Sequence, residues 1–377
     1  MVEALVHHSG EAYAVAAERA AGWATKKLED LIAKGRDNAK QTLEYVDTHQ
    51  PVDAVCSAQD LAFSVQEGLK LWFHGRKSGI HRNALIQMAE KAGLPSPTAL
   101  TDFLSQPHQV KHLAGIFQDQ FQKTEGRYLI RSLEGQVRGF LSDKYRRLDS
   151  RPMIAALVDE AVNKYHAVPV EAKALDTSVY LKLIMPEVYE PVPNEVGVFG
   201  LCFRTSDYGH GRLWLKGFFY RLWCTNLAMT EDGLSQIHLG SRLSDEIEFS
   251  RRTMELDTET MASAIQDVTR MILSPTNIQR RLTAIQTANE EIVNADETLL
   301  RMRNKSRITK AEEKDIKEAF ASADIENLPA GSTKWRLSNA ISLLAQKAEP
   351  DRALELENMA GQVAGLHLAK DVEKELN

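Results

Sequence analysis

The sequence predicts an α+β protein in which a central, mainly antiparallel sheet is flanked by helical regions at both ends. The hydrophobic period is helical over most of the first 122 residues, changes to the two-residue period of strands at Arg127, and becomes helical again after Leu243. Short, turn-forming connections between the strands favour antiparallel pairing. We therefore expect a mainly helical region at residues 1–122, an α+β domain with basic strands at 123–241, and a helical region at 242–377.

The first region carries the helical pattern in several segments. Apolar residues recur at helical spacings in the first 50 residues and again at 60–72, 83–92, 98–104 and 109–122. Gly93, followed by Pro95 and Pro97, is a typical end for the helix at 83–92.

The central domain is expected to follow the order β-β-α-β-β-β-β. It begins with a hairpin at 127–141, in which Glu134-Gly135 forms the turn. Ser150 is a suitable N-cap for a helix that reaches about residue 163, with Pro152 in its first turn, and this helix would cover one face of the sheet. The remaining strands are expected at 168–174, 179–185, 197–204 and 212–224.

The last region repeats the helical period several times. Helices are expected up to residue 271, at 277–303, at 310–320 and at 332–346. Pro350 begins another helix that ends near Gly361.

Positive charge is concentrated in the central domain. The chain of 377 residues has a net charge of −6, yet residues 123–151 hold eight Lys or Arg against four Asp or Glu. On a solvent-facing sheet, arginines could contact phosphates while tyrosines stack on bases. The alternative is that these cations pair with Glu134, Asp143 and Asp149 on an ordinary solvated face. The candidate nucleic-acid-binding residues are Arg127, Arg131, Arg138, Lys144, Tyr145, Arg146, Arg147, Arg204, Arg212 and Lys216.

The sequence contains no familiar catalytic or cofactor motif. A phosphate loop, a dinucleotide-binding glycine pattern, Gly-x-Ser-x-Gly and His-Glu-x-x-His are all missing, so no catalytic residue, metal or cofactor is predicted. Asp207 and His210 fit a turn better than a metal site. An enzyme of unfamiliar type is a further alternative, in which Asp143, Asp149, Asp207 and His210 converge.

The cysteines and the hydropathy indicate a cytoplasmic protein that does not enter a membrane. Cys56, Cys202 and Cys224 are widely spaced and lack a Cys-x-x-Cys pair, which favours buried, reduced thiols. The longest apolar runs are shorter than the ~18–20 residues that span a bilayer, and the N-terminus lacks the profile of a signal peptide.

Three blocks of sequence resemble the phage/plasmid-like proteins of a prokaryotic domain family of unknown function. The blocks lie at 137–149, at 220–227, and at 334–341 with 351–357, within a resemblance that spans about residues 127–364. In the family pattern Gly usually follows Cys-Thr-Asn, where this chain has Leu227. The resemblance implies a setting in mobile-element DNA and no particular activity.

The order of strands is also similar to the core of Rad52-like single-strand annealing proteins. This similarity implies a homo-oligomer in which basic hairpins form a continuous groove for single-stranded DNA. Our leading hypothesis is therefore a phage- or plasmid-type protein that binds, and promotes annealing of, single-stranded DNA. The alternative is a non-enzymatic assembly protein that binds a host or virion partner through its helical regions.

Overall fold

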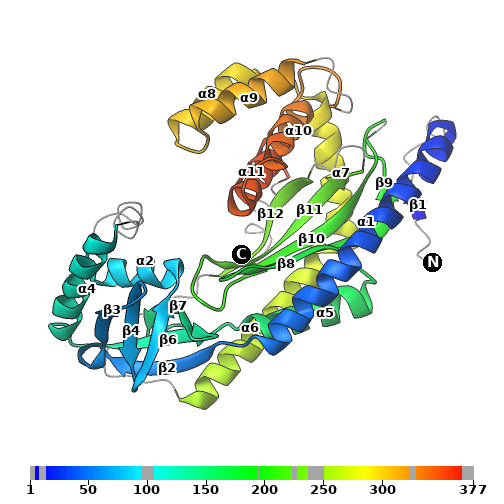
Figure 1. Cartoon of the computed structure of the whole chain (residues 1–377). Coiled ribbons are helices and arrows are strands. Elements are labelled where there is room, and N and C mark those ends of the chain that lie inside the picture. Colours follow the sequence, from blue (N-terminus) through cyan, green and yellow to red (C-terminus); the bar gives the residue numbers. More distant parts are fainter. Residues whose placement is uncertain are drawn as a thin grey trace, which may run out of the picture.

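The computed structural model describes residues 5–7, 14–94, 106–193, 195–222, 227–236, 250–322 and 328–366. In these residues the chain forms two six-stranded sheets, with helices before, between and after them (Figure 1). The predicted α+β class is confirmed, because helices at both ends flank a mainly antiparallel sheet. The presence of a second sheet is the main difference from the prediction.

Sheet A contains the predicted later strands. Its order is β1-β9-β10-β11-β12, with β8 also paired to β9. All its pairs are antiparallel except the parallel pair of β1 and β9. The strand β12 follows the strands that the sequence predicted. The bounds are β1 Leu5–His7, β8 Val168–Ala174, β9 Val179–Tyr189, β10 Gly197–Thr205, β11 Leu213–Arg221 and β12 Leu227–Gln236.

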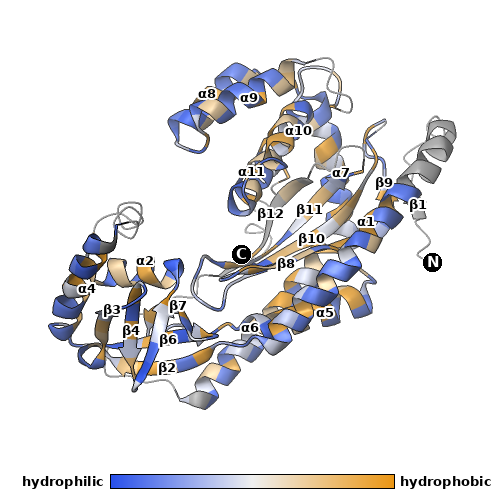
Figure 2. Cartoon of the chain, in the orientation of Figure 1, coloured by the Kyte–Doolittle hydropathy of each residue, from blue (hydrophilic) through white to orange (hydrophobic). Residues whose placement is uncertain are grey.

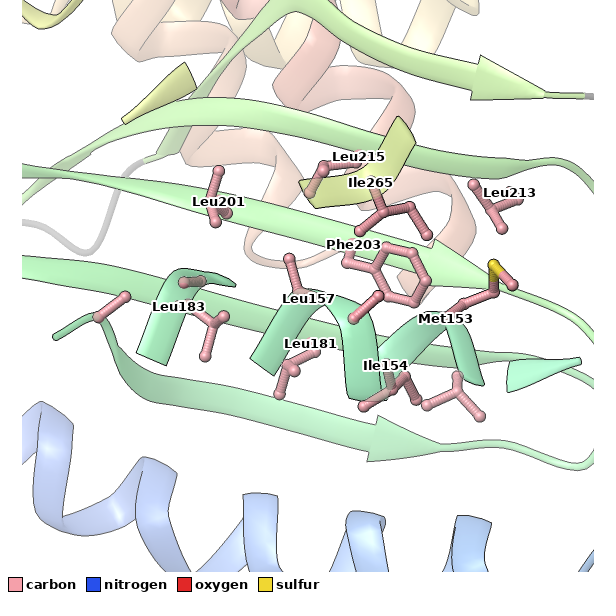
Figure 3. Packing of buried hydrophobic residues seen from close by; sticks show 14 of the residues in the cluster. Met153, Ile154, Leu157, Leu181, Leu183, Leu201, Phe203, Leu213, Leu215 and Ile265 are labelled. Carbon is pink, nitrogen blue, oxygen red and sulfur yellow. The ribbon is translucent and has the colours of Figure 1, made fainter. Parts of the chain in front are cut away.

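Apolar side chains on one face of sheet A pack against α5 (Ser150–Val158) and α6 (Arg251–Ile272). Figure 2 shows that apolar residues are prominent in the strands of sheet A and in α5. Leu201 and Phe203 lie on this face beside Leu157 and Ile265 (Figure 3). Each such side chain contributes about 1.5–3 kcal/mol when fully buried. The predicted helix from residue 150 is confirmed, although Asp149 precedes its first turn as the N-cap and a π-helix continues it at Asp159–Lys164.

Helix α1 (Ala14–Thr48) lies along β8 at the edge of sheet A (Figure 1). The close approach depends on Gly35, since a Cβ atom there would lie 2.3 Å from the carbonyl oxygen of Pro169. The helical prediction for the first 50 residues is therefore confirmed within the described part of that segment.

Sheet B corrects the prediction for the first region. Its order is β2-β6-β7-β5-β4-β3, so the basic hairpin β6–β7 pairs with strands from the first 122 residues, and the expected boundary at residue 123 falls inside this sheet. The predicted helix at 60–72 is wrong, because this segment forms β3 and much of β4. The bounds are β2 Val52–Ser57, β3 Ala62–Val65, β4 Leu69–Phe73, β5 Arg76–Ile80, β6 Arg127–Leu133 and β7 Gln136–Ser142.

Two helices cover the apolar face of sheet B. Helices α2 (Arg82–Lys91) and α4 (Pro107–Gln122) confirm the predictions at 83–92 and 109–122, and both contribute to one core with β3, β4 and β7. The helix expected at 98–104 lies outside the described residues.

The C-terminal helices confirm the predicted helical region, with one additional break. The helix expected at 277–303 is interrupted after residue 290, where the Lys334 N–H donates to the Glu291 carbonyl at 2.9 Å. Helices α10 and α11 pack on sheet A, whereas α8 and α9 project away from it (Figure 1). The bounds are α7 Pro275–Glu290, α8 Ala295–Asn304, α9 Lys310–Ala321, α10 Lys334–Ala345 and α11 Pro350–Val363.

The start of α9 makes a pH-dependent contribution to stability. Glu312 accepts hydrogen bonds from Arg352 at 2.8 Å and from the Thr309 N–H at 2.7 Å, within a capping box. The bonds from Arg352, followed by those from Thr309, outweigh burial and lower the pKa of Glu312 to about 2.

Because the folded pKa lies below the ordinary value of about 4.3, ionised Glu312 stabilises the fold above that pH. This stabilisation should disappear as the pH falls from about 4.3 towards 2. We therefore expect Glu312→Gln to lower the free energy of unfolding at pH 6, and the difference from the wild type to shrink by pH 2.5. Urea denaturation across this range measures it, and a difference independent of pH would contradict the assignment.

Candidate nucleic-acid interface

Arg131, the central cation of the predicted hairpin, is buried. Its side chain is 2% exposed and donates to Asp53 Oδ1 at 2.8 Å and to the Asp207 carbonyl at 2.6 Å. A third nitrogen lies 2.7 Å from Asp149 Oδ1. Burial alone would lower the pKa of Arg131, but Asp149 and Asp53 outweigh burial and raise this pKa. Arg131 is therefore a charged structural residue that is inaccessible to a phosphate.

Arg138, the second cation of the hairpin, is buried at the junction of the two sheets. It donates to the Asp176 carbonyl at 2.9 Å and to the Tyr45 hydroxyl at 3.2 Å, and one nitrogen lies 3.5 Å from Glu134 Oε2. Its guanidinium also lies 6.0 Å from the centre of the Tyr208 ring. These contacts connect the hairpin to α1, to the β8–β9 turn and to the β10–β11 loop.

The segment after the hairpin connects sheet B to α6. Arg146 binds both carboxylate oxygens of Asp257, with Nε 2.7 Å from Oδ2. Arg147 Nε lies 3.1 Å from Asp53 Oδ2, and its Nη1 donates to the sulfur of Met254 at 3.1 Å. The other two candidates of this segment, Lys144 and Tyr145, are half-buried and buried, and burial raises the pKa of Tyr145.

The candidates on sheet A mostly face α11. Arg204 lies 2.8 Å from Asp351 Oδ1, and Lys216 Nζ donates to Asn358 Oδ1 at 2.6 Å. Both cations are thus covered by the helix that packs on this part of the sheet. The remaining two candidates, Arg127 and Arg212, are exposed.

The ten candidate residues therefore do not share one exposed face: Arg131 and Arg138 are buried, whereas Arg127 and Arg212 are exposed. Arg131 and Arg138 fasten sheet B to the rest of the molecule, and Arg204 is paired with α11. The alternative interpretation is correct in two of its pairings, Arg131 with Asp149 and Arg138 with Glu134. It is wrong about the solvated face, because both arginines are buried.

The β10–β11 loop is part of the same junction. Asp207 Oδ1 accepts hydrogen bonds from the Ser150 N–H at 2.6 Å and the Ser150 hydroxyl at 2.8 Å. The Tyr208 carbonyl accepts from Asn83 at 3.0 Å and from Gln87 at 2.9 Å. In the part of the chain that the structure describes, no group of three or more His, Cys, Asp or Glu side chains is arranged to hold a metal ion.

Two of the four residues of the enzyme hypothesis, Asp149 and Asp207, line one pocket. A pocket of about 440 Å³ opens beside Asp149, Ser150 and Asp207. Burial, followed by the neighbouring Asp149, raises the pKa of Asp207. Asp143 and His210 are not among the described residues that line this pocket, and His210 Nδ1 lies 2.6 Å from Thr177 Oγ1.

Two of the three cysteines lie in the described part of the chain. Cys56 and Cys202 are buried free thiols, and burial raises the pKa of each, while Cys224 lies outside the described residues. Within the described residues, every helix falls short of the length and apolar character needed to cross a bilayer.

An exposed tryptophan on the outer face of sheet B marks a different surface. Trp72 in β4 is 40% exposed and lies directly opposite Ala62 of β3 and Lys77 of β5. Its indole Nε1 donates to Ser64 Oγ at 2.9 Å, which fixes the orientation of the ring. Lys77 Nζ lies 5.7 Å from the ring centre and also donates to Gln66. The three residues Ala62, Trp72 and Lys77, which lie side by side across β3, β4 and β5, therefore combine an accessible aromatic ring with an adjacent cation.

The adjacent set of paired residues on the same face adds a second lysine between two small residues. Lys70 of β4 lies between Ser64 of β3 and Gly79 of β5, and Gly79 is paired in turn with Gln136 of β7. Ala62 lies opposite Trp72, and Ser64 and Gly79 lie opposite Lys70, so the neighbours of both side chains on this face include small residues. We call Ala62, Ser64, Lys70, Trp72, Lys77 and Gly79 the β3–β5 face.

This face was not predicted from the sequence, because residues 60–72 were expected to form a helix. The signal that could have identified it is the pair of turns Glu67-Gly68 and His74-Gly75, whose residues all have positive φ, at 53°, 95°, 46° and 71°. His74-Gly75 is a two-residue turn like Glu134-Gly135 of the recognised hairpin, at 51° and 74°, whereas three residues separate the paired Val65 and Leu69. Two-residue turns with positive φ at both positions are the type I′ turns that connect antiparallel strands.

Comparison with known proteins gives no assignment. No family model, curated protein or solved structure matches this chain at a significant level.

Proposed function

We propose that this protein binds single-stranded DNA on the β3–β5 face. The observation that carries the proposal is the exposure of Trp72 beside Lys77 and Lys70 on an antiparallel sheet. Aromatic rings on open sheets stack on unpaired bases, and nearby cations bind the phosphates between those bases. In this proposal the DNA-binding site is the exposed β3–β5 face and not the buried arginines of the first hypothesis, which a DNA strand cannot reach.

Several features favour single strands over base-paired DNA at this face. A ring can stack only on a base whose face is exposed, and paired bases in a duplex are already stacked on each other. The lysines supply charge without the fixed fork of arginine that reads a base edge. Binding should therefore be insensitive to sequence and sensitive to salt.

Removing the indole should weaken binding without unfolding the protein. We expect Trp72→Ala to raise the Kd for a fluorescent oligothymidylate by about 5- to 150-fold, which corresponds to about 1–3 kcal/mol for the stacking of one base. Fluorescence anisotropy at 50 mM salt measures the Kd. Trp72→Phe is the matched control, because it keeps a ring for stacking and should retain most of the affinity.

The outcomes separate this proposal from its alternatives. If Trp72→Ala and Trp72→Phe both bind like the wild type, the β3–β5 face is not the site. If the wild type binds no oligonucleotide at 50 mM salt, the DNA-binding function is wrong, and the assembly-protein hypothesis becomes the better one. Annealing and self-association stay predictions, which native mass spectrometry with and without oligonucleotide would test.

A further inference from the structure

A second accessible basic surface lies at the connection between α8 and α9. Residues 301–310, which we call the hairpin tip, contain five cations and no acidic residue. The tip belongs to the two helices that project from the body of the molecule (Figure 1) and that are coloured mainly as hydrophilic in Figure 2. Its cations are Arg301, Arg303, Lys305, Arg307 and Lys310.

Carboxylates outside the tip neutralise only part of this charge. Arg303 lies 2.7 Å from the buried Glu313, and Arg301 lies 3.1 Å from Glu297 in a pair that is more than half exposed on both sides. Lys305, Arg307 and Lys310 are all exposed. Arg307 donates to the neutral amide of Gln362, which leaves its charge uncompensated by that contact.

The tip is held in one conformation by its own backbone and by the core beneath it. Ser306 has a φ of 54°, and the N–H groups of Ser306 and Arg307 donate to the carbonyls of Arg303 and Met302 at 2.8 and 3.0 Å. This closes α8 with the Schellman pattern. Ile308 is 3% exposed and anchors the loop in the core shared with α10 and α11. Little backbone conformational entropy would be lost when the cations contact a ligand.

The chemistry of the tip differs from that of the β3–β5 face. Residues 298–311 contain no aromatic side chain, so this surface can attract charge but cannot stack on bases. Duplex DNA presents a dense array of phosphates, about one charge per 1.7 Å of axis, and no exposed base face. We propose that the hairpin tip is a binding site for the phosphate backbone of duplex DNA. The protein would then hold paired and unpaired DNA on two separate surfaces.

The test uses the full chain and a 20-base-pair duplex of mixed sequence. Lys305→Gln/Arg307→Gln/Lys310→Gln should bind this duplex more weakly than the wild type at 50 mM salt. Loss of three phosphate contacts lowers the salt slope by about 2.7, so the loss of affinity between 50 and 200 mM salt should be about 40-fold smaller for the variant. Binding of single strands through Trp72 should be retained.

The matched control is Lys40→Gln/Arg280→Gln/Lys314→Gln, which removes the same charge from exposed positions outside the tip. If both triple variants weaken duplex binding equally, or if the wild type does not bind the duplex, the proposal is overturned. Either result leaves the single-strand assay unaffected, so the two proposals fail separately. Should the triple variant fold poorly, Lys305→Gln/Lys310→Gln preserves the contact of Arg307 with Gln362 and is read in the same way.

Discussion

Arg131→Met is expected to lower the free energy of unfolding by about 3–5 kcal/mol, because removing the buried cation of an ion cluster takes that charge away from Asp149 and leaves Asp53 with Arg147 alone. Asp53 and Asp149 would lose the guanidinium that now lies 2.8 and 2.7 Å from them. The Asp207 carbonyl would also lose its donor. Denaturation in urea at pH 7 measures the change.

Arg212→Met is the control for this prediction. Arg212 is exposed in the β10–β11 connection, and substitutions at such positions usually change stability by no more than about 0.5 kcal/mol. A variant Arg131→Met that is as stable as the wild type but defective in DNA binding would contradict the structural role. That result would restore the first hypothesis, in which the hairpin itself contacts phosphates.

The strands of sheet A were predictable because their sequence shows alternating apolar residues between short turns. Residues such as Leu181, Leu183, Leu201 and Phe203 occupy one buried face in strict alternation, and short turns connect the strands. Strand β3 and the start of β4 gave no such signal, because Leu61, Val65, Leu69 and Trp72 also fit the spacing of a helix. Pairing with neighbouring strands decides between the two structures, and in the local sequence only the turn residues Glu67-Gly68 and His74-Gly75 indicate that pairing.

The burial of the candidate site residues could not be predicted either, because it depends on partners that are distant along the chain. The carboxylate of Asp53 that binds Arg131 is 78 residues away along the chain, and the Asp207 carbonyl is 76 residues away. A run of cations in a sequence looks the same whether its partners are water, phosphates or distant carboxylates. The charge of the hairpin was therefore identified correctly, but its exposure depended on contacts that only the folded chain reveals.

A buried network connects two of the blocks on which the family resemblance rests. Arg221 donates to Glu195 Oε1 at 2.7 Å and to Asn339 Oδ1 at 2.9 Å, while the indole of Trp335 donates to Glu195 Oε2 at 3.0 Å. All four side chains are buried. Arg221 of the first block is thus connected in the interior to Trp335 and Asn339 of the second, where β11 meets α10. These residues hold the C-terminal helices on sheet A.

Arg221→Met is expected to cost about 3–5 kcal/mol of unfolding free energy at pH 7, since Glu195 would be left as an unpaired buried charge. Burial already raises the pKa of Glu195 against the opposing effect of Arg221, so the substitution should raise this pKa further. A carboxyl whose pKa is raised on folding stabilises the fold at low pH and loses that contribution as the pH rises. The deficit of Arg221→Met should therefore be smaller at pH 5 than at pH 8.

The double variant Arg221→Met/Glu195→Leu provides the control. Replacing both charges with apolar groups removes the unpaired carboxylate, so it should recover part of the lost stability and abolish the extra pH dependence of the single variant. Equal deficits for Arg221→Met at pH 5 and pH 8 would show that Glu195 is not the group left uncompensated. If the prediction holds, Arg221 and Glu195 maintain the attachment of the C-terminal helices to sheet A.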